Sequence, residues 1–308
     1  MPKAKKERVK RPKMERYTRR DFERDFPTDD ACLEWLKDYL YPEGIFCQTC
    51  ERVTKHHKVA SRKSYSCDYC GHHVHPTADT IYHKSSTPLR QWFLAVFLMA
   101  STRCGISAKQ LERELGVTYK TAWRMFKQIR SMLSEDGSDP LAGRVEVDET
   151  YVGGKAKNMH KSRREKVIQG RGAVGKVPVV GAVQREGRVI AKTAAEVNAD
   201  TLMPFVKEHV MPESTVFTDE HRGYNDVEAS GYGHKRVQHS AKVYAMGDAH
   251  TNTIEGFWSL VKNGIRGVYH NVGADYLQSY FDEYAFRYNR RYDTTPMFRS
   301  FLAQVRKS

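Results

Sequence analysis

The sequence contains no long apolar run and no feature typical of a secreted protein. Its longest apolar stretch, Trp92 to Ala100, is far shorter than the roughly 20 residues that a membrane-spanning helix needs. No segment has the pattern of a signal peptide. The six cysteines are not distributed like a disulfide framework, and four of them form two C-x-x-C pairs. We therefore expect no membrane segment, a location in the reducing cytoplasm, and cysteines that bind metal.

Acidic residues are too few to balance the basic ones. The 308 residues include 51 Lys and Arg but only 37 Asp and Glu, so the formal net charge is +14. This excess predicts a polyanionic partner, most simply nucleic acid. The alternative is a soluble basic protein with no such partner. The length is sufficient for two or three domains, and we find no internal repeat.

The N-terminal segment has little apolar surface. Residues 1–24 are rich in Lys and Arg, so we predict a disordered basic arm that either follows DNA phosphates or only keeps the protein soluble. Residues 29–41 predict a short amphipathic helix with an aspartate as its cap. Cys32 in that helix is interpreted as a small core residue.

The two C-x-x-C pairs have the spacing of a zinc site. Cys47 and Cys50 are followed, after sixteen residues, by Cys67 and Cys70. The spacing predicts a zinc ribbon in residues 25–87, in which four thiolates hold a structural Zn2+ and leave no open position for catalysis. Neighbouring histidines could replace one cysteine, although ordinary surface histidines are the simpler interpretation. These are His56, His57, His72, His73 and His75. We place the remaining cysteine, Cys104, in the core.

Residues 88–133 predict a helical domain. Apolar residues from Leu89 to Ala100 recur at helical spacing. Ser107 and Thr118 are expected to cap two further helices, and Gly116 to end the first of them. Two helices joined by a short glycine turn predict a helix-turn-helix, with a plain helical hairpin as the alternative. Its second helix would present four side chains to DNA: Tyr119, Lys120, Arg124 and Lys127.

After a polar linker at residues 134–144, the remaining chain predicts an α/β domain from 145 to 308. Its order of strands and helices is that of a mixed sheet with helices packed on it. One predicted strand ends at Asp148, a second ends at Asp219, and a helix begins near Asn252 with Glu255 in its first turn. Residues 153–176 are rich in Gly, Lys and Arg, and predict a mobile basic loop or an unremarkable surface insertion.

Three acids at two strand ends and a helix start suit hard divalent cations. A pair of metal ions held by Asp148, Asp219 and Glu255 could carry out phosphodiester displacement. Alternatively, Glu255 could be a capping residue, with Asn252 or Asp248 as the third ligand. Lys262 lies two helical turns after Glu255 and could contact a phosphate, or it could be a solvated lysine. The neighbouring acids Glu149 and Glu220 are expected on the opposite strand faces.

Taken together, these motifs resemble a known family. Besides the zinc ribbon and the helix-turn-helix, the runs at 145–155, 218–224, 252–259 and 284–291 are similar to the ISXO2-like zinc-ribbon insertion-sequence transposases, bacterial relatives of the eukaryotic Merlin elements. The resemblance extends from about residue 25 to the C-terminus. It implies an RNase H-like catalytic domain with a DDE triad and Mg2+ or Mn2+. The triad would be Asp148, Asp219 and Glu255, with Lys262 as the basic residue that follows it. Some members use Asn at the third position, which keeps Asn252 as an alternative.

The sequence thus predicts a DNA transposase. Its ribbon and helix-turn-helix would bind the terminal inverted repeats, and its catalytic domain would free a 3′-hydroxyl and transfer it to target DNA. Because two ends must be joined, we expect a homodimer or a larger synaptic complex on the nucleoid. The alternatives are a DNA-binding regulator with an inert second domain, and a metal-dependent nuclease that stops at hydrolysis.

Overall fold

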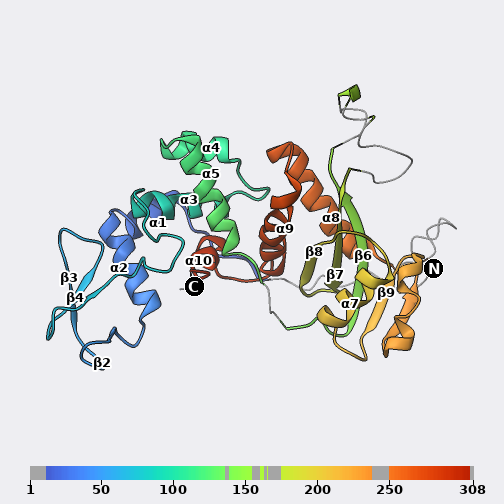
Figure 1. Ribbon diagram of the computed structural model, residues 1–308, viewed down its shortest axis with the longest axis horizontal. Coiled ribbons are helices and arrows are strands. Elements are labelled where there is room, and N and C mark those ends of the chain that lie inside the picture. Colours follow the sequence, from blue (N-terminus) through green and yellow to red (C-terminus); the bar gives the residue numbers. More distant parts are fainter. Residues whose placement is uncertain are drawn as a thin grey trace. The chain divides into compact units, whose positions relative to one another are not determined.

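The computed structural model describes residues 12–135, 139–154, 160–162, 165, 175–237 and 250–305. The chain forms two compact units, coloured along the sequence in Figure 1. The first unit combines residues 1–132 with residues 292–308, and the second contains residues 133–291. The predicted α/β domain was expected to extend to residue 308, but its last segment belongs to the first unit. None of the described helices combines the length and apolar character of a membrane span.

The first unit combines short strands with six helices among its described residues. Its strands form a two-stranded antiparallel sheet, β1–β2, and a three-stranded antiparallel sheet, β3–β4–β5. The elements are α1 (Arg19–Asp25), α2 (Asp29–Leu40), β1 (Phe46–Cys47), β2 (Arg52–Val53), β3 (His56–Lys58), β4 (Tyr65–Cys67), β5 (His73–Val74), α3 (Leu89–Ser101), α4 (Ala108–Leu115), α5 (Tyr119–Ser131) and α10 (Met297–Leu302).

Helix α1 begins inside the segment that we predicted to be disordered. Thr18 and Asp21 form a capping box, in which the Thr18 side chain accepts from the backbone of Asp21 and the Asp21 side chain accepts from the backbone of Thr18. Phe22 is fully buried. A cap and one buried aromatic side chain are sufficient to order a short helix on a larger core. The prediction is therefore wrong for residues 19–24, while residues 1–11 lie outside the described residues.

Helix α2 confirms the helix predicted at residues 29–41, but its cap is Thr28 rather than an aspartate. The Thr28 hydroxyl accepts from the Ala31 amide. Asp29 instead accepts from the Leu89 and Arg90 amides at 3.0 and 2.8 Å, at the first turn of α3. A carboxylate there satisfies two amides that have no partner within their own helix. Asp29 thus joins the starts of two helices that are distant in sequence.

The C-terminal segment returns to the first unit through aromatic packing. The Phe298 ring, on α10, lies 5.9 Å from the rings of both Phe22 and Phe26 and 5.6 Å from that of Phe97. Aromatic contacts of this kind bury large apolar areas. The C-terminus therefore closes the core formed by the N-terminal helices.

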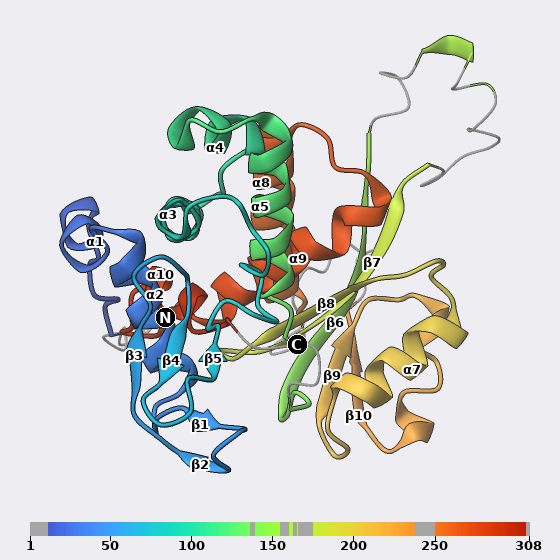
Figure 2. The same cartoon turned by 60° about the vertical axis from the view of Figure 1, so that its left-hand side comes forward.

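Helices α4 and α5 confirm the two capped helices predicted around Gly116. Ser107 and Thr118 accept from the amides of Gln110 and Thr121. Gly116 has a φ of +63°, a left-handed conformation that favours glycine. Figure 2 shows α4 and α5 as consecutive helices beside α3. Their packing buries Leu111, Leu115 and Met125, and leaves the outer face of α5 exposed.

The second unit is built on a five-stranded mixed sheet with strand order β10–β9–β6–β7–β8. Strand β7 is antiparallel to β6 and β8, while β9 is parallel to both β6 and β10. The elements are β6 (Arg144–Val152), β7 (Val177–Gln184), β8 (Val189–Thr193), α7 (Ala199–His209), β9 (Thr215–Thr218), the 3-10 turns η2 (Arg222–Tyr224) and η3 (Glu228–Ser230), β10 (Gly233–Arg236), α8 (Asn252–Gly264), the π-helical turn η5 (Ile265–Tyr269) and α9 (Ala274–Asn289).

Helices cover both faces of this sheet, as Figure 2 shows. On one face, α7 packs on a core that includes Val147, Val180 and Ala182. On the other face, α8 and α9 pack on a core that includes Val179 and Val183. Neighbouring residues of β7 thus serve opposite cores, as the two-residue period of a strand requires. The mixed sheet flanked by helices confirms the predicted α/β class.

Side chains from α9 also cover the outer edge of β8. The Asn289 amide accepts from Val189 N–H at 2.7 Å and donates to Val189 C=O at 3.1 Å. The Gln278 amide likewise accepts from Thr193 N–H at 2.7 Å and donates to Ala191 C=O at 3.0 Å. Because an open edge invites pairing with another strand, these two amides protect the sheet from such association.

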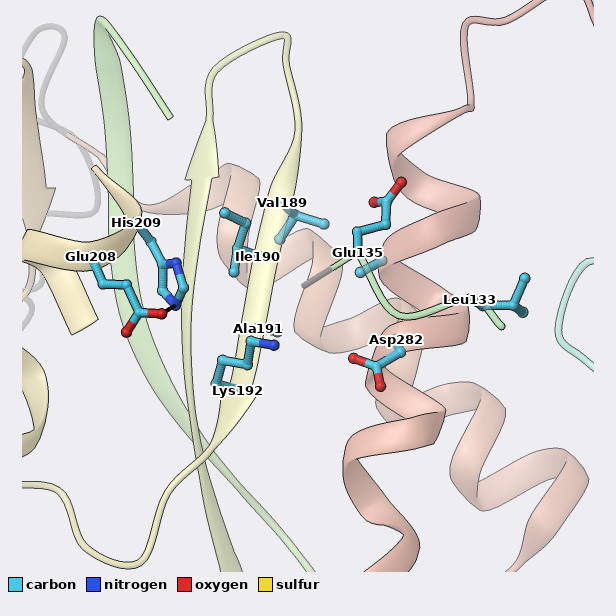
Figure 3. Close-up of a pocket in the computed structure, with 10 residues that line it drawn as sticks. Leu133, Glu135, Val189, Ile190, Ala191, Lys192, Glu208, His209 and Asp282 are labelled. Atoms are coloured by element: carbon cyan, nitrogen blue, oxygen red, sulfur yellow. Dashed lines mark ion pairs between the residues drawn. The ribbon is translucent and has the colours of Figure 1, made fainter. Parts of the chain in front are cut away.

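A cavity of about 220 Å3 lies next to this edge, between β8, α9 and the end of α7. Figure 3 shows Glu135 and Asp282 on one side of it, His209 and Glu208 on the other, and β8 between them. Glu135 accepts from Asn289 at 2.7 Å and from Arg290 at 2.6 Å. Glu135 therefore helps to hold α9 in place, and it is not one of the acids predicted to be catalytic.

Two sequence predictions fall partly outside the described residues. Most of the basic loop predicted at 153–176 lies there, and so does Asp248, one alternative for the third metal ligand. Two others are corrected. The predicted linker ends at residue 144, where β6 has already begun. Cys104, expected in the core, is exposed.

Candidate active site

The four predicted zinc ligands converge. The Sγ atoms of Cys47, Cys50, Cys67 and Cys70 all lie within 4.8 Å of one another. Cys47 and Cys70 are 3.4 Å apart, and Cys50 and Cys67 are 3.9 Å apart. A tetrahedral Zn2+ with Zn–S bonds of about 2.3 Å requires S–S distances of about 3.8 Å, so the four sulfurs fit this ion. Among the described residues no histidine belongs to the cluster.

The backbone explains why these sulfurs meet. Cys47 ends β1 and Cys67 ends β4, and each is followed by a tight turn that carries the second cysteine of its pair. Gly71 has a φ of +73° after the second pair, which favours glycine at that position. Thr54 lies 3.2 Å from Cys67 Sγ, and its hydroxyl lowers the pKa of that thiol to about 5. A thiolate is the form that binds zinc.

In the second unit, Asp148 and Asp219 come from adjacent parallel strands. The register pairs Arg144 with Thr215 and Glu146 with Phe217. Continued by two residues, it sets Asp219, the residue directly after β9, beside Asp148. Asp148 is not at the end of its strand as predicted, because β6 continues to Val152. The strand carrying Asp219 does end there, and Asp219 Oδ1 accepts from the His221 amide at 2.9 Å.

Acidic charge is crowded at this place. Burial raises the pKa of Asp148 to about 7, and the negative charges of Glu149 and Asp219 act in the same direction. Burial and Asp219 also raise the pKa of Glu149. Carboxylates that disfavour each other's ionisation are typical of functional sites, and a bound cation would relieve the repulsion.

Helix α8 is attached to this site through Trp258. Its indole Nε1 donates to Asp148 Oδ2 at 2.8 Å. Glu255 lies three residues earlier on the helix and Lys262 four residues later, so all three share one helix face. Burial and the charge of Arg266 lower the pKa of Lys262, while Asp148 acts in the opposite direction. The negative charge of Asp148 therefore acts on the pKa of Lys262.

Glu255 is exposed and its carboxylate accepts from the Thr251 hydroxyl at 3.1 Å. The cap of α8 is Thr251, so Asn252, which is also exposed, is the first helical residue rather than the cap. In the described parts of the chain, the only group of three or more acidic, His or Cys side chains near enough to share a metal ion is the zinc cluster. The structure thus brings Asp148 and Asp219 together, with Glu255 on the neighbouring helix.

Sequence reasoning missed Glu146, which anchors α8. This carboxylate is completely buried. It accepts from Arg185 Nε at 2.8 Å, from the Thr253 amide and hydroxyl at 2.8 and 2.9 Å, and from the Ile254 amide at 3.1 Å. An acid at a helix N-terminus satisfies its free amides and its dipole. The only signal in the sequence was a second acid two residues before Asp148, on the same strand face.

Gly181 was missed as well. It stands opposite Asp148 in the β6–β7 pair. A Cβ atom at Gly181 would lie 2.4 Å from Cη2 of Trp258, closer than real Cβ contacts allow. Glycine at this position therefore lets the indole lie flat over the sheet and reach Asp148. A glycine within a strand often marks such a close approach.

The four residues predicted to contact DNA are all exposed on α5: Tyr119, Lys120, Arg124 and Lys127. Arg124 also packs over the Trp92 ring at 5.7 Å and donates to Ser85 Oγ at 3.3 Å. Arg124 thus has contacts within its own unit, and so has Tyr119, because Lys109 Nζ lies 5.6 Å from the centroid of its ring.

Comparison with known proteins agrees with this arrangement. Residues 140–289 match the model of the ISXO2-like transposase domain, and residues 27–73 match that of the transposase zinc-ribbon domain. A protein in the transposable element ISH50 of Halobacterium salinarum is 30% identical over 272 residues, covering 83% of this chain and 90% of its own. A transposase-like protein of Haemophilus influenzae is 28% identical over 102 residues, covering 33% and 81%.

Among solved structures, the Mos1 strand transfer complex is matched with 12% identity over 69% of this chain and 74% of that chain, at a TM-score of 0.28. The two family models fall on the two parts of the molecule just described, the four-cysteine cluster and the sheet that carries Asp148. The long match to the ISH50 protein covers both. The chain therefore belongs to the ISXO2-like family of insertion-sequence transposases.

Proposed function

We propose that the second unit is the catalytic domain of a DNA transposase and has an RNase H-like fold. The strand order supports the fold proposal. The strands β6, β7 and β8 are antiparallel, and the sheet continues beyond β6 with the parallel strands β9 and β10. The observation that carries the functional proposal is the adjacency of Asp148 and Asp219 on parallel strands, next to a helix that carries Glu255 and Lys262.

Asp148, Asp219 and Glu255 would hold Mg2+ or Mn2+, whose bound ions would activate an attacking oxygen and stabilise a leaving oxygen of a phosphodiester. The residues fit such ions because the raised pKa of Asp148 reflects burial among other acids. Trp258 Nε1 donates to Oδ2 of Asp148 and so orients this carboxylate. Lys262, on the same helix face, would contact the phosphate group. Glu255 would have to exchange its bond from Thr251 for the metal site.

We further propose that the first unit recognises the ends of the element. The zinc ribbon is a structural module, and α5 presents Tyr119, Lys120, Arg124 and Lys127 on an exposed face. These side chains would enter the major groove of the terminal inverted repeats. The catalytic domain would hydrolyse a phosphodiester at each end and transfer the resulting 3′-hydroxyl into target DNA. A homodimer or larger synaptic complex would hold the two ends, and the net charge of +14 would assist binding to DNA in the nucleoid.

The test is a strand-transfer assay with DNA that carries the inverted repeats flanking the gene, in the presence of Mg2+. Joining of a 3′ end to new DNA supports a transposase, cleavage without joining indicates a nuclease, and binding without cleavage indicates a regulator. Asp148→Ala and Asp219→Ala should abolish both steps, whereas Asp200→Asn, at an exposed acid of α7, should abolish neither. Undiminished joining by either alanine variant would refute the assigned roles. Comparing Glu255→Gln with Asn252→Ala identifies the third ligand.

A further inference from the structure

A small cavity lies beside the candidate active site, where β6 ends and α8 passes into the π-helical turn η5. Its volume is about 80 Å3. Its lining includes Gly153, Gly154, Lys262, Arg266 and His270, and all of these residues belong to the second unit. Lys262 is the residue whose charge is coupled to that of Asp148. The cavity thus shares Lys262 with the face of α8 that carries Glu255 and Trp258.

Basic side chains gather at this cavity. The charges of Arg266 and Lys176 both act on Lys262 to lower its pKa, after the larger effect of burial. Among the residues that the structure describes, neither Lys262 nor Arg266 makes an ion pair with an acid. Other arginines of this unit are paired: Arg185 with Glu146, Arg287 with Glu283 and Arg290 with Glu135. Cations held together without an acid are typical of a site for an anionic ligand.

The backbone around the cavity is strained. Helix α8 changes to a π-helical turn at Ile265–Tyr269, and His270 follows with a φ of +60°. A left-handed conformation in a residue other than glycine is strained and occurs preferentially at ligand sites, and π-helical turns are also frequent at functional sites. Arg266, within this turn, and His270, directly after it, both line the cavity.

The end of β6 also lines the cavity, with Gly153 and Gly154 beside Tyr151 and Val152. A Cβ atom at Gly154 would meet no heavy atom within 4 Å, so the space beside it is open. At Gly153 a Cβ atom would lie 3.1 Å from Cα and Cγ of Lys176, so this glycine lets Lys176 pack close to the cavity. Paired glycines permit close approach of a ligand to the main chain.

We propose that this cavity is a subsite for a backbone phosphate of the DNA strand whose phosphodiester lies at Asp148, with Arg266 and His270 as its ligands. The proposal rests on the proposed transposase function, because it takes its ligand from the same DNA strand. Its lining includes Lys262, Arg266 and His270, whose N–H groups suit a phosphate oxygen. The subsite would hold the strand in register with the acids.

The test measures binding of a duplex that carries the element's terminal repeat, by fluorescence anisotropy over a series of NaCl concentrations. All proteins carry Asp148→Asn so that the DNA stays intact. Adding Arg266→Gln should reduce the slope of log Kd against log salt by about 1, the value for one phosphate contact. Lys207→Gln, at an exposed lysine of α7, removes the same charge and should leave the slope unchanged. An equal loss in both variants would overturn the proposal.

A second arm locates the phosphate. Neutral methylphosphonates are placed one at a time along the strand. At one position the methylphosphonate should weaken DNA binding by the parent protein on the order of tenfold. The same methylphosphonate should have little effect on DNA binding by the Arg266→Gln or His270→Ala variants. If every position affects parent and variants equally, there is no subsite. Thermal stabilisation of the parent by inorganic phosphate, without any such position in DNA, would assign the cavity to free phosphate and overturn the DNA assignment.

The two proposals fail in different ways. If the protein with Asp148 intact cleaves and joins element ends while Arg266→Gln changes neither the salt slope nor the methylphosphonate pattern, the subsite is refuted and the transposase function stands. If the coupling between Arg266 and one phosphate is found but no cleavage occurs with Mg2+ or Mn2+, the subsite stands and the catalytic proposal is refuted.

Discussion

The indole Nε1 of Trp258 donates a 2.8 Å hydrogen bond to Oδ2 of Asp148, and so joins helix α8 to the central strand β6. Two further features support this bond. Gly181 leaves the space in which the indole lies, and Glu146 holds the first turn of α8 on the same strand. The bond lowers the pKa of Asp148, but burial outweighs it and leaves the pKa at about 7. The candidate active site is therefore a place where carboxylate charge is costly unless a cation is present.

The first prediction concerns stability and pH without Mg2+. The pKa of Asp148 is about 7 in the folded protein, whereas the ordinary value for an aspartate is 3.8. Between these values the folded state keeps a proton that the unfolded chain has lost, so the free energy of unfolding falls as pH rises toward 7. Asp148→Asn removes this effect and should be more stable than the wild type at pH 8 by on the order of 2 kcal/mol.

The measurement is urea denaturation at several pH values, with zinc present and no Mg2+. The gap between Asp148→Asn and the wild type should narrow as pH falls below 7, and should also narrow at pH 8 when Mg2+ is added. Asp200→Asn, at an exposed acid, is the control, and its stability at pH 8 relative to the wild type should not change when Mg2+ is added. A wild type as stable as Asp148→Asn at pH 8 would contradict the prediction.

The second prediction concerns the glycine opposite Asp148. Gly181→Ala places a Cβ atom 2.4 Å from Cη2 of Trp258, so the indole must move and its bond to Asp148 is lost. Overpacking of this kind costs roughly 1–3 kcal/mol, and we expect DNA cleavage to fall together with stability. Gly256→Ala is a matched control, because a Cβ atom on that turn of α8 meets no heavy atom within 4 Å.

In the control, alanine replaces glycine within a helix and should increase stability by up to about 1 kcal/mol. Denaturation curves and Trp fluorescence report on both variants. The role assigned to Gly181 would be wrong if Gly181→Ala melted like Gly256→Ala and cleaved DNA at the wild-type rate.

The third prediction separates anchoring from stability alone. Glu146→Ala removes the carboxylate that pairs with the buried Arg185 guanidinium, and breaking such a pair costs about 3–5 kcal/mol. Glu283 is equally buried on α9 and pairs with Arg287 at 2.7 Å, so Glu283→Ala is the comparison. Both variants should lose stability. At a temperature where both remain folded, we expect only Glu146→Ala to lose cleavage per folded molecule, because only Glu146 holds the first turn of the helix that carries Glu255.

Cleavage rates normalised to the folded fraction, read from circular dichroism, provide the measurement for this pair. Glu146→Gln adds a further point, since an amide still accepts from the α8 backbone but cannot neutralise Arg185. Equal cleavage by the alanine variants at both positions would show that Glu146 has no role beyond stability.

The fourth prediction concerns zinc. Cys67→Ser removes one of four sulfurs that lie within 4.8 Å of one another, so the protein should bind less than one equivalent of zinc and the ribbon should unfold, because such small domains depend on their metal. Cys104→Ser, at an exposed cysteine, should keep full zinc content and stability. Elemental analysis and thermal melting distinguish the two. Retention of a full equivalent of zinc by Cys67→Ser would show that another residue supplies the fourth ligand.

Features encoded by neighbouring residues could be predicted from the sequence. Cap residues such as Ser107 and Thr118 bond to amides three positions away, and Gly116 has the left-handed conformation that ends a helix. One failure arose where a long-range partner competed with a local one. Asp29 was expected to cap its own helix, but it bonds to the start of α3, sixty residues later, and Thr28 takes the local role.

The sequence by itself determined the zinc ribbon, the capped helices and the acids that a transposase would use, because each depends on the spacing of residues along a short stretch of backbone. Only the tertiary structure decided that Asp219 lies beside Asp148, that Glu146 and Gly181 dock α8 on the sheet, and that residues 292–305 return to the first unit. The physical reason is that strand order and helix docking depend on the burial of apolar faces from distant segments. Many partners satisfy a given apolar pattern, and the packed core selects one of them.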